Sequence, residues 1–185
     1  MSLLVWDFGL CSAEHITKKM LSYPRLSNPT PAIWLGEHPT VVTLGIRSSN
    51  NPPIDSALPT LAVARGGLTT LHLPGQLMFY PLVRLNEHGL QVRSWVSLLE
   101  DCVIKTLSAF GGYGLRCHGE PGVYLPQGKV AAIGIKIING WSTFGLCLNI
   151  SCPLAPYKKI IPCGLSNRPI TSMYASGLRS VKMSD

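Results

Sequence analysis

One stretch of the chain follows helical spacing for five turns, and it separates two groups of shorter segments. Its apolar residues recur every three or four positions from Val92 to Phe110, and Gly111-Gly112 supplies the stop. A shorter helix is expected from Ser12, which can act as its N-cap, to about Tyr23, because Pro24 ends it. The sequence therefore predicts one long helix and a shorter one near the N-terminus.

The other segments are short, β-rich runs separated by Gly, Pro and Asn. Residues 47–59, rich in Ser, Asn and Pro, form an expected surface loop, and Asn139-Gly140 predicts a hairpin turn. Many strands with two or three helices predict a single α+β domain, with a largely antiparallel or mixed sheet flanked by helices. The expected strands are 3–8, 32–36, 40–44, 60–64, 69–72, 77–83, 113–117, 122–125, 129–138 and 143–150.

Composition excludes several classes of protein. The chain has 185 residues, of which 46% are apolar and 14% charged, enough for an ordinary core and unlike a disordered chain. Apolar runs are too short for a membrane span, and Asp7 interrupts the first of them before a secretory signal could form. The 6 cysteines contain no C-x-x-C pair, which favours reduced thiols in the cytoplasm over disulfide or zinc frameworks.

The charge balance favours an acidic partner. Lys and Arg number 16 against 9 Asp and Glu, for a net charge of +7. Basic residues are dispersed, with adjacent pairs only at Lys18-Lys19 and Lys158-Lys159, and an aromatic-basic RNA motif is absent. We therefore expect attraction to an acidic protein rather than to nucleic acid or a membrane.

Three segments could carry chemistry. The first, residues 65–76, reads R-G-G-L-T-T-L-H-L-P-G-Q. Paired glycines let the backbone approach a ligand closely, and Arg65, Thr70, His72 and Gln76 place polar groups around it. The spacing matches neither a P-loop nor a dinucleotide fingerprint, so a plain hairpin is the alternative for this segment.

The second segment begins at Lys129 and continues as an apolar strand to Lys136. Lys129 shares a strand face with Ala131, so small side chains beside it leave room for a ligand. The alternative is a strand-end lysine that reaches water.

The third segment is Pro162-Cys163-Gly164. A cysteine between Pro and Gly is held on a constrained backbone, where an accessible nucleophile can stand. To react it must be a thiolate, and a nearby cation would lower its pKa from the free value of about 8.5.

Together these segments resemble the lipoyl(octanoyl) transferase family. The match comprises R-G-G-x-x-T-x-H-x-P-G-Q at 65–76, G-V-Y at 122–124, G-K-V-A-A-I-G at 128–134, G-L-C-L-N at 145–149, P-C-G at 162–164 and T-S at 171–172, in that order. Glu37-His38-Pro39 and Thr43-Leu44-Gly45 match the family upstream. The resemblance covers roughly residues 30–173 and implies a biotin/lipoate protein ligase-like fold, with residues 1–185 as one catalytic domain.

The resemblance implies a cytoplasmic, monomeric acyltransferase of lipoate biosynthesis that needs no ATP, metal or other cofactor. It would transfer an octanoyl group from octanoyl-acyl carrier protein to a lysine of lipoyl domains and of the glycine cleavage H protein. Cys163 would form the acyl-enzyme, and Lys129 would lower its pKa and shuttle protons. The implied substrate-binding residues are Arg65, Gly66, Gly67, Leu68, Thr69, Thr70, Leu71, His72, Ala132, Ile133, Gly134, Gly145, Leu146 and Cys147.

The chain departs from the family at several positions. Phe144 replaces the usual His, Leu73 a usual Gly, and Leu68 a commonly polar residue, which predicts a tighter and more apolar pocket. The chain ends 13 residues after Ser172, so we expect a shortened C-terminal helix that Ser172 caps and that reaches Leu178.

Two other functions remain open on the sequence. An ATP-dependent lipoate or biotin protein ligase would share the fold but would not need Cys163. A non-catalytic module that binds acyl carrier or lipoyl domains would fit Phe144, whereas the joint presence of Lys129 and Cys163 opposes it.

Overall fold

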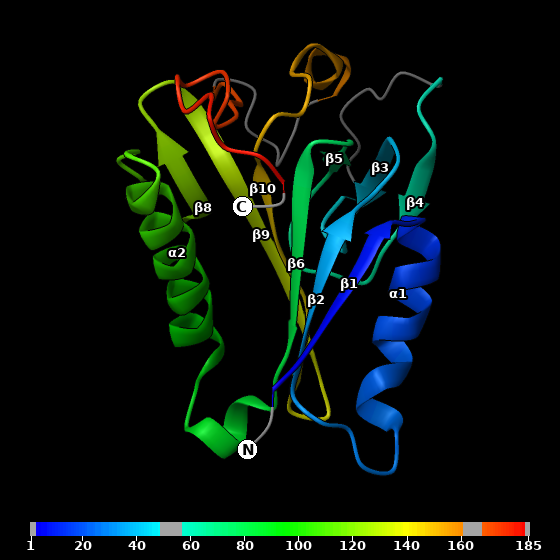
Figure 1. Ribbon diagram of the computed structural model, residues 1–185. Helices are drawn as coiled ribbons and strands as arrows, with labels where there is room; N and C mark the ends of the chain where they lie inside the picture. Colours follow the sequence, from blue (N-terminus) through cyan, green and yellow to red (C-terminus); the bar gives the residue numbers. More distant parts are fainter. Residues whose placement is uncertain (1–2, 49–56, 161–167, 184–185) are drawn as a thin grey trace.

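A seven-stranded mixed sheet forms the frame of the molecule (Figure 1). The computed structural model describes residues 3–48, 57–160 and 168–183. The first two strands of the sheet are parallel, and all other neighbours are antiparallel. In spatial order the strands are β1 (Leu4–Leu10), β2 (Ala32–Glu37), β6 (Gln76–Leu82), β10 (Trp141–Asn149), β9 (Gly128–Ile138), β8 (Glu120–Leu125) and β7 (Leu115–Cys117).

A second, three-stranded sheet lies beside the large one. Its order is β4 (Thr60–Ala62), β3 (Val41–Leu44), β5 (Thr70–His72), with β3 parallel to β4 and antiparallel to β5. Three short 3₁₀ segments, η1 (Tyr23–Arg25), η2 (Leu85–His88) and η3 (Ala155–Lys159), lie in connections. None of the described helices is long and apolar enough to cross a membrane.

The long helix α2 (Val92–Ala109) covers one side of the large sheet (Figure 1). It buries Trp95, Leu99, Val103 and Leu107 against strands β8, β9 and β10. At its start the Ser94 hydroxyl accepts a hydrogen bond from the Gln91 N–H, at 3.1 Å, as part of a capping box. The helix expected at 92–110 is confirmed, because its apolar residues pack on the sheet and its end lies just before the expected glycine stop.

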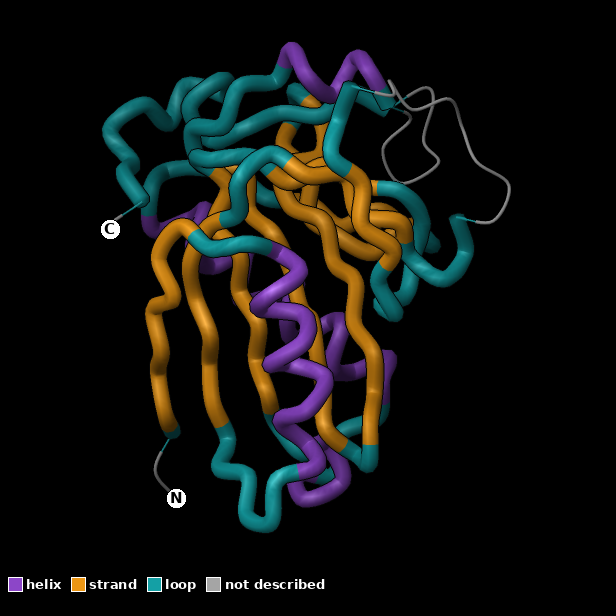
Figure 2. Tube along the Cα trace, turned by 90° about the vertical axis from the view of Figure 1, so that its right-hand side faces the viewer, coloured by secondary structure: helices purple, strands orange, loops and turns teal. Residues whose placement is uncertain are grey.

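The helix α1 (Ala13–Ser22) covers the other side and runs along the front of the long strands in Figure 2. Its Ile16 and Met20 are fully buried against residues of β2 and β6. Ser12 occupies the expected N-cap position, but its side chain makes no capping hydrogen bond. The predicted position of this helix is confirmed, whereas the prediction that the Ser12 side chain caps it is wrong.

All ten expected strands are present, with ends displaced by a few residues. The hairpin between β9 and β10 turns at Asn139-Gly140, where φ is 50° and 81°. The helix expected from Ser172 to Leu178 is wrong, because residues 173–177 form turns. The Ser172 hydroxyl does accept the Ala175 N–H at 3.1 Å, so this side chain caps a turn instead of a helix.

Removing one buried hydroxyl tests how α2 is held on the sheet. The Trp95 indole N–H donates to the Ser142 Oγ of β10 at 2.7 Å, and Ser142 is fully buried. Ser142→Ala leaves this N–H without an acceptor and should lower the free energy of unfolding by about 1–3 kcal/mol in urea titrations. Ser108→Ala on the exposed face of α2 should change it little; equal losses in both variants would contradict the role of Ser142.

Candidate active site

A cavity of about 480 Å³ lies between the two sheets and the N-terminal ends of α1 and α2. Its size is typical of small-molecule pockets, which span about 300–1,000 Å³. Apolar side chains from both core clusters, including Met78, Phe144 and Leu146, form much of its wall. Polar groups come from β3, from the segment at 65–72, from the start of β9 and from five further residues, Thr17, His38, Arg47, Tyr80 and Glu120.

The structure brings nearly all of the predicted site residues to this one cavity. The lining includes Arg65, Gly66, Gly67, Leu68, Thr70, His72, Lys129, Ala132, Ile133, Gly134, Gly145, Leu146 and Cys147. Thr69 and Leu71 do not line it and are fully buried. Leu71 lies on β5 between Thr70 and His72, so strand alternation directs it into a separate apolar cluster. Cys163 lies outside the described residues.

A directed chain of hydrogen bonds begins at the cavity wall. The Arg65 guanidinium donates to the Thr43 Oγ1 at 2.9 Å, and Thr43 lies 3.1 Å from the His72 Nε2. The His72 Nδ1 lies 2.7 Å from the Gln76 Oε1, an acceptor, so Nδ1 carries the proton and Nε2 accepts from Thr43. Burial lowers the pKa of His72 to about 3, which keeps the ring neutral.

The chain continues from the fully buried Gln76 across the large sheet. The Gln76 Nε2 donates to the Asn149 Oδ1 at 2.7 Å and to the Tyr157 hydroxyl at 2.9 Å. Asn149 in turn donates to the Thr171 carbonyl at 2.9 Å. Thr171 donates its N–H to the Lys129 carbonyl, also at 2.9 Å, so the chain ends on the backbone of Lys129.

Lys129 stands at the start of β9 with only 4% of its surface exposed. The alternative of a lysine that reaches water is therefore wrong. Its Nζ donates to the Pro121 carbonyl at 2.9 Å and lies 5.2 Å from the centre of the Tyr124 ring. Gly122 has φ +132°, and a Cβ there would lie 2.6 Å from the Lys129 Cε. Only glycine admits both this backbone and this close approach.

His38 and Tyr80 are among the cavity residues that the sequence reasoning left without a role. The His38 Nδ1 lies 2.6 Å from the Cys11 carbonyl and therefore donates to it, while Nε2 accepts the Tyr80 hydroxyl proton at 2.9 Å. Burial lowers the pKa of His38 and raises that of Tyr80. His38 lies in the Glu37-His38-Pro39 segment, and the match of this segment to the family could have indicated it. Nothing in the sequence around Tyr80 indicated the cavity.

Phe144 lines the cavity in an unusual backbone conformation. It pairs with Ile135 across β10 and β9, so regular alternation would place both side chains on the same face. Its φ of 59° instead turns the ring to the α1 side, where it packs with Ile16 and Met20, while Ile135 packs on the α2 side. Of the other departures, Leu68 lines the cavity and Leu73 is buried in a separate cluster.

The neutral His72 makes stability depend on pH. Its folded pKa of about 3 lies below the ordinary value of 6.5, so between these values the unfolded chain binds a proton that the folded chain does not. The free energy of unfolding should therefore fall as pH drops from about 6.5 towards 3, with His72 contributing up to about 1.4 kcal/mol per pH unit.

Urea titrations across this pH range, in the wild type and in His72→Gln, measure the effect. The variant should be less stable near pH 7 but should show a shallower slope below pH 6.5. His118→Gln replaces an exposed histidine and should keep the wild-type slope. An unchanged slope in His72→Gln would contradict a neutral, buried ring.

Comparisons with known proteins identify the family. The family model described as the lipoyl protein ligase A/B catalytic domain matches residues 15–185. An octanoyltransferase of Aromatoleum aromaticum is 40% identical over 187 residues, covering 100% of this chain and 77% of that protein. An octanoyltransferase of Bordetella petrii is 43% identical over 155 residues, covering 80% of this chain and 73% of that protein.

A solved structure supports the fold independently. The crystal structure of lipoate-protein ligase A bound with ATP superposes with a TM-score of 0.77 at 12% identity, covering 98% of this chain and 78% of that one. This likeness confirms the lipoate protein ligase-like fold that the motifs implied. The family match and the two relatives show that the chain belongs to the lipoyl protein ligase A/B catalytic-domain family and, within it, to the octanoyltransferases.

Proposed function

We propose that this protein transfers an octanoyl group from octanoyl-acyl carrier protein, through a thioester on Cys163, to a lysine of lipoyl domains and of the glycine cleavage H protein. The observation that carries the proposal is the buried Lys129 at the wall of a largely apolar cavity. Burial of an eight-carbon chain there, at about 0.8 kcal/mol per CH₂, would contribute several kcal/mol to binding. The reaction takes place in the cytoplasm and is the first step of protein lipoylation.

Two acyl transfers complete the reaction. In the first, the Cys163 thiolate attacks the thioester carbonyl, the S–C bond to the carrier breaks, and the Lys129 ammonium gives a proton to the departing carrier thiolate. In the second, the acceptor lysine amine attacks the acyl-enzyme, its proton passes to Lys129, and the Cys163 thiolate leaves. Both groups return to their starting states, and a thioester is already activated, so the scheme uses no ATP or metal.

The charge of the chain supports these macromolecular partners. A protein with a net charge of +7 attracts acidic carrier and lipoyl domains over a distance, and the attraction weakens as salt is added. The match to the lipoyl protein ligase A/B catalytic domain supports lipoyl-domain proteins as the acceptors. The donor, the H protein as acceptor and a monomeric state are parts of the proposal.

Intact-protein mass spectrometry tests the acyl-enzyme. After incubation with octanoyl-acyl carrier protein, the wild type should gain one octanoyl group, which should move to an apo lipoyl domain when that is added. Cys163→Ser should gain none, because its hydroxyl is a weak nucleophile. Cys102→Ser, which removes an exposed free thiol on α2, should behave as wild type.

Two other outcomes would replace the proposal. Octanoylation of the lipoyl domain only with ATP and free octanoate would indicate a ligase. Retained binding of the carrier or lipoyl domain without an adduct or transfer, in the wild type as in Cys163→Ser, would indicate a binding module.

The coupling of Lys129 to Cys163 has its own test. A cation near the thiol stabilises the thiolate, so Lys129→Ala should raise the apparent pKa of Cys163, measured as the rate of thiol alkylation against pH. Acyl transfer should slow about 10²- to 10⁴-fold, the usual contribution of a positioned acid or base. If the apparent pKa is unchanged, Lys129 does not have the proposed role.

A further inference from the structure

One peptide group of β8 lies between Lys129 and a buried carboxylate. The Pro121 carbonyl accepts from the Lys129 Nζ at 2.9 Å, and the N–H of the same peptide group, on Gly122, donates to the Glu100 Oε1 at 3.0 Å. The C=O and N–H of a trans peptide point in opposite directions. A single planar group therefore links the ammonium on one side to the carboxylate on the other.

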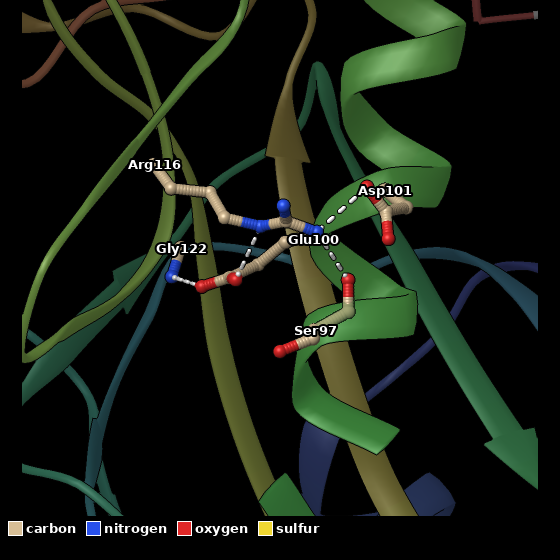
Figure 3. A network of polar contacts seen from close by, with 5 residues as sticks. All are labelled: Ser97, Glu100, Asp101, Arg116 and Gly122. Carbon is tan, nitrogen blue, oxygen red and sulfur yellow. Dashed lines mark hydrogen bonds and ion pairs between the residues drawn. The ribbon is translucent and has the colours of Figure 1, made fainter. Parts of the chain in front are cut away.

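Glu100 is an unusual residue for its position. It lies on the buried side of α2 with 7% exposure, where the other buried residues of the helix are all apolar. A carboxylate there loses its hydration and needs compensating hydrogen bonds. One oxygen receives the Gly122 N–H, and the other receives the Arg116 Nε at 2.9 Å (Figure 3). Both oxygens of the buried acid are thus occupied.

Arg116 is itself fixed by α2. Its Nη2 donates to the Ser97 carbonyl at 2.9 Å and pairs with the Asp101 carboxylate at 2.6 Å, as Figure 3 shows. Two neighbouring acids of one helix therefore share one arginine. Glu100 also contacts the peptide of β8, whereas the contacts of Asp101 in this network are confined to Arg116. Asp101 is about half exposed, and this difference makes it a matched control.

We propose that Glu100 is a positioning residue, which holds the Lys129 amine at the cavity wall through the Pro121–Gly122 peptide group. The negative carboxylate polarises the peptide, and the carbonyl at its other end becomes a stronger acceptor for the ammonium. Because Gly122 has no side chain, the Lys129 stem packs directly on that peptide. The proposal rests on the proposed role of Lys129 in acyl transfer.

Other charged groups face Lys129 from the more exposed side of β8. Glu120 interacts electrostatically with Lys129, but its carboxylate also accepts the Tyr124 hydroxyl at 2.8 Å and pairs with Arg168 at 3.3 Å. The Arg168 guanidinium lies 5.7 Å from the centre of the Tyr124 ring. These groups remain unchanged in variants of Glu100, so a change in the pH dependence can be assigned to the buried acid.

Glu100→Gln compared with Asp101→Asn tests the proposal. Gln keeps the shape of the side chain and an acceptor for the Gly122 N–H but removes the charge. Single-turnover acyl transfer should slow about tenfold, the effect of weakening one hydrogen bond to a charged group. The high-pH limb of the pH–rate profile should move to lower pH, because the ammonium is held less strongly. Asp101→Asn should keep the wild-type rate and profile.

The outcomes separate positioning from a merely structural role. A folded Glu100→Gln protein with the wild-type rate and profile would overturn the proposal, and so would equal effects of the two variants. Glu100→Asp keeps the negative charge but places it one methylene further from the peptide. Its pH–rate profile should lie between those of the wild type and Glu100→Gln. If Glu100→Gln does not fold, Glu100→Asp becomes the deciding variant, and a wild-type profile in it would overturn the proposal.

A second readout does not depend on activity. NMR titration of lysine labelled with ¹³C at Cε, with the Lys129 signal assigned from Lys129→Arg, follows the ammonium directly. Its midpoint should be lower in Glu100→Gln than in Asp101→Asn, and equal midpoints would overturn the proposal. If the wild type transfers no acyl group, the proposed function fails, but this titration still decides whether Glu100 holds Lys129.

Discussion

The buried side-chain amide of Gln76 joins the two sheets, and the site depends on this junction. The amide oxygen accepts a hydrogen bond from the His72 ring of the small sheet. The amide nitrogen donates to Asn149 of the large sheet and to Tyr157 of η3. Buried polar groups without partners are costly, so each member of such a network fixes the orientation of the next. The positions of Arg65 and Thr43 on the cavity wall therefore follow from the same contacts that hold the sheets together.

Lys129 is held from several directions that originate in distant parts of the sequence. The backbone of residues 169–171 pairs with its N–H and carbonyl, and the β8 peptide receives its ammonium. Helix α2 supports that peptide through Glu100. A reactive group built on rigid elements with locked neighbours loses little freedom when a substrate binds, which is how preorganisation accelerates a reaction. The Gln76 network and the Glu100 contact thus constrain opposite ends of one lysine.

Periodicity predicted the helices and strands, because it depends on contacts that are local in sequence. The predicted residues that line the cavity came mainly from the family resemblance, and they make up less than half of the lining. Alternation on β5 explains why Thr70 and His72 reach the cavity and Leu71 does not. Glu100 could not be predicted this way: within the helical pattern it is one more polar residue, and its partners Gly122 and Arg116 become neighbours only when α2 packs on β7 and β8. The turned ring of Phe144 likewise depends on a positive φ that no propensity favours for Phe.

The hydrogen bonds of the cavity support the assignment of proton transfer to Lys129. A general base needs a free lone pair, but both ring nitrogens of His38 and of His72 are engaged by neighbouring groups, and burial lowers the pKa of both rings. Phe144 does not titrate at all. Lys129 differs because its hydrogen bond to the Pro121 carbonyl uses one of three ammonium hydrogens, so a proton can leave without breaking this contact. The imidazoles are therefore fixed parts of the wall, and these contacts favour the proposed exchange of protons by Lys129 over one by either histidine.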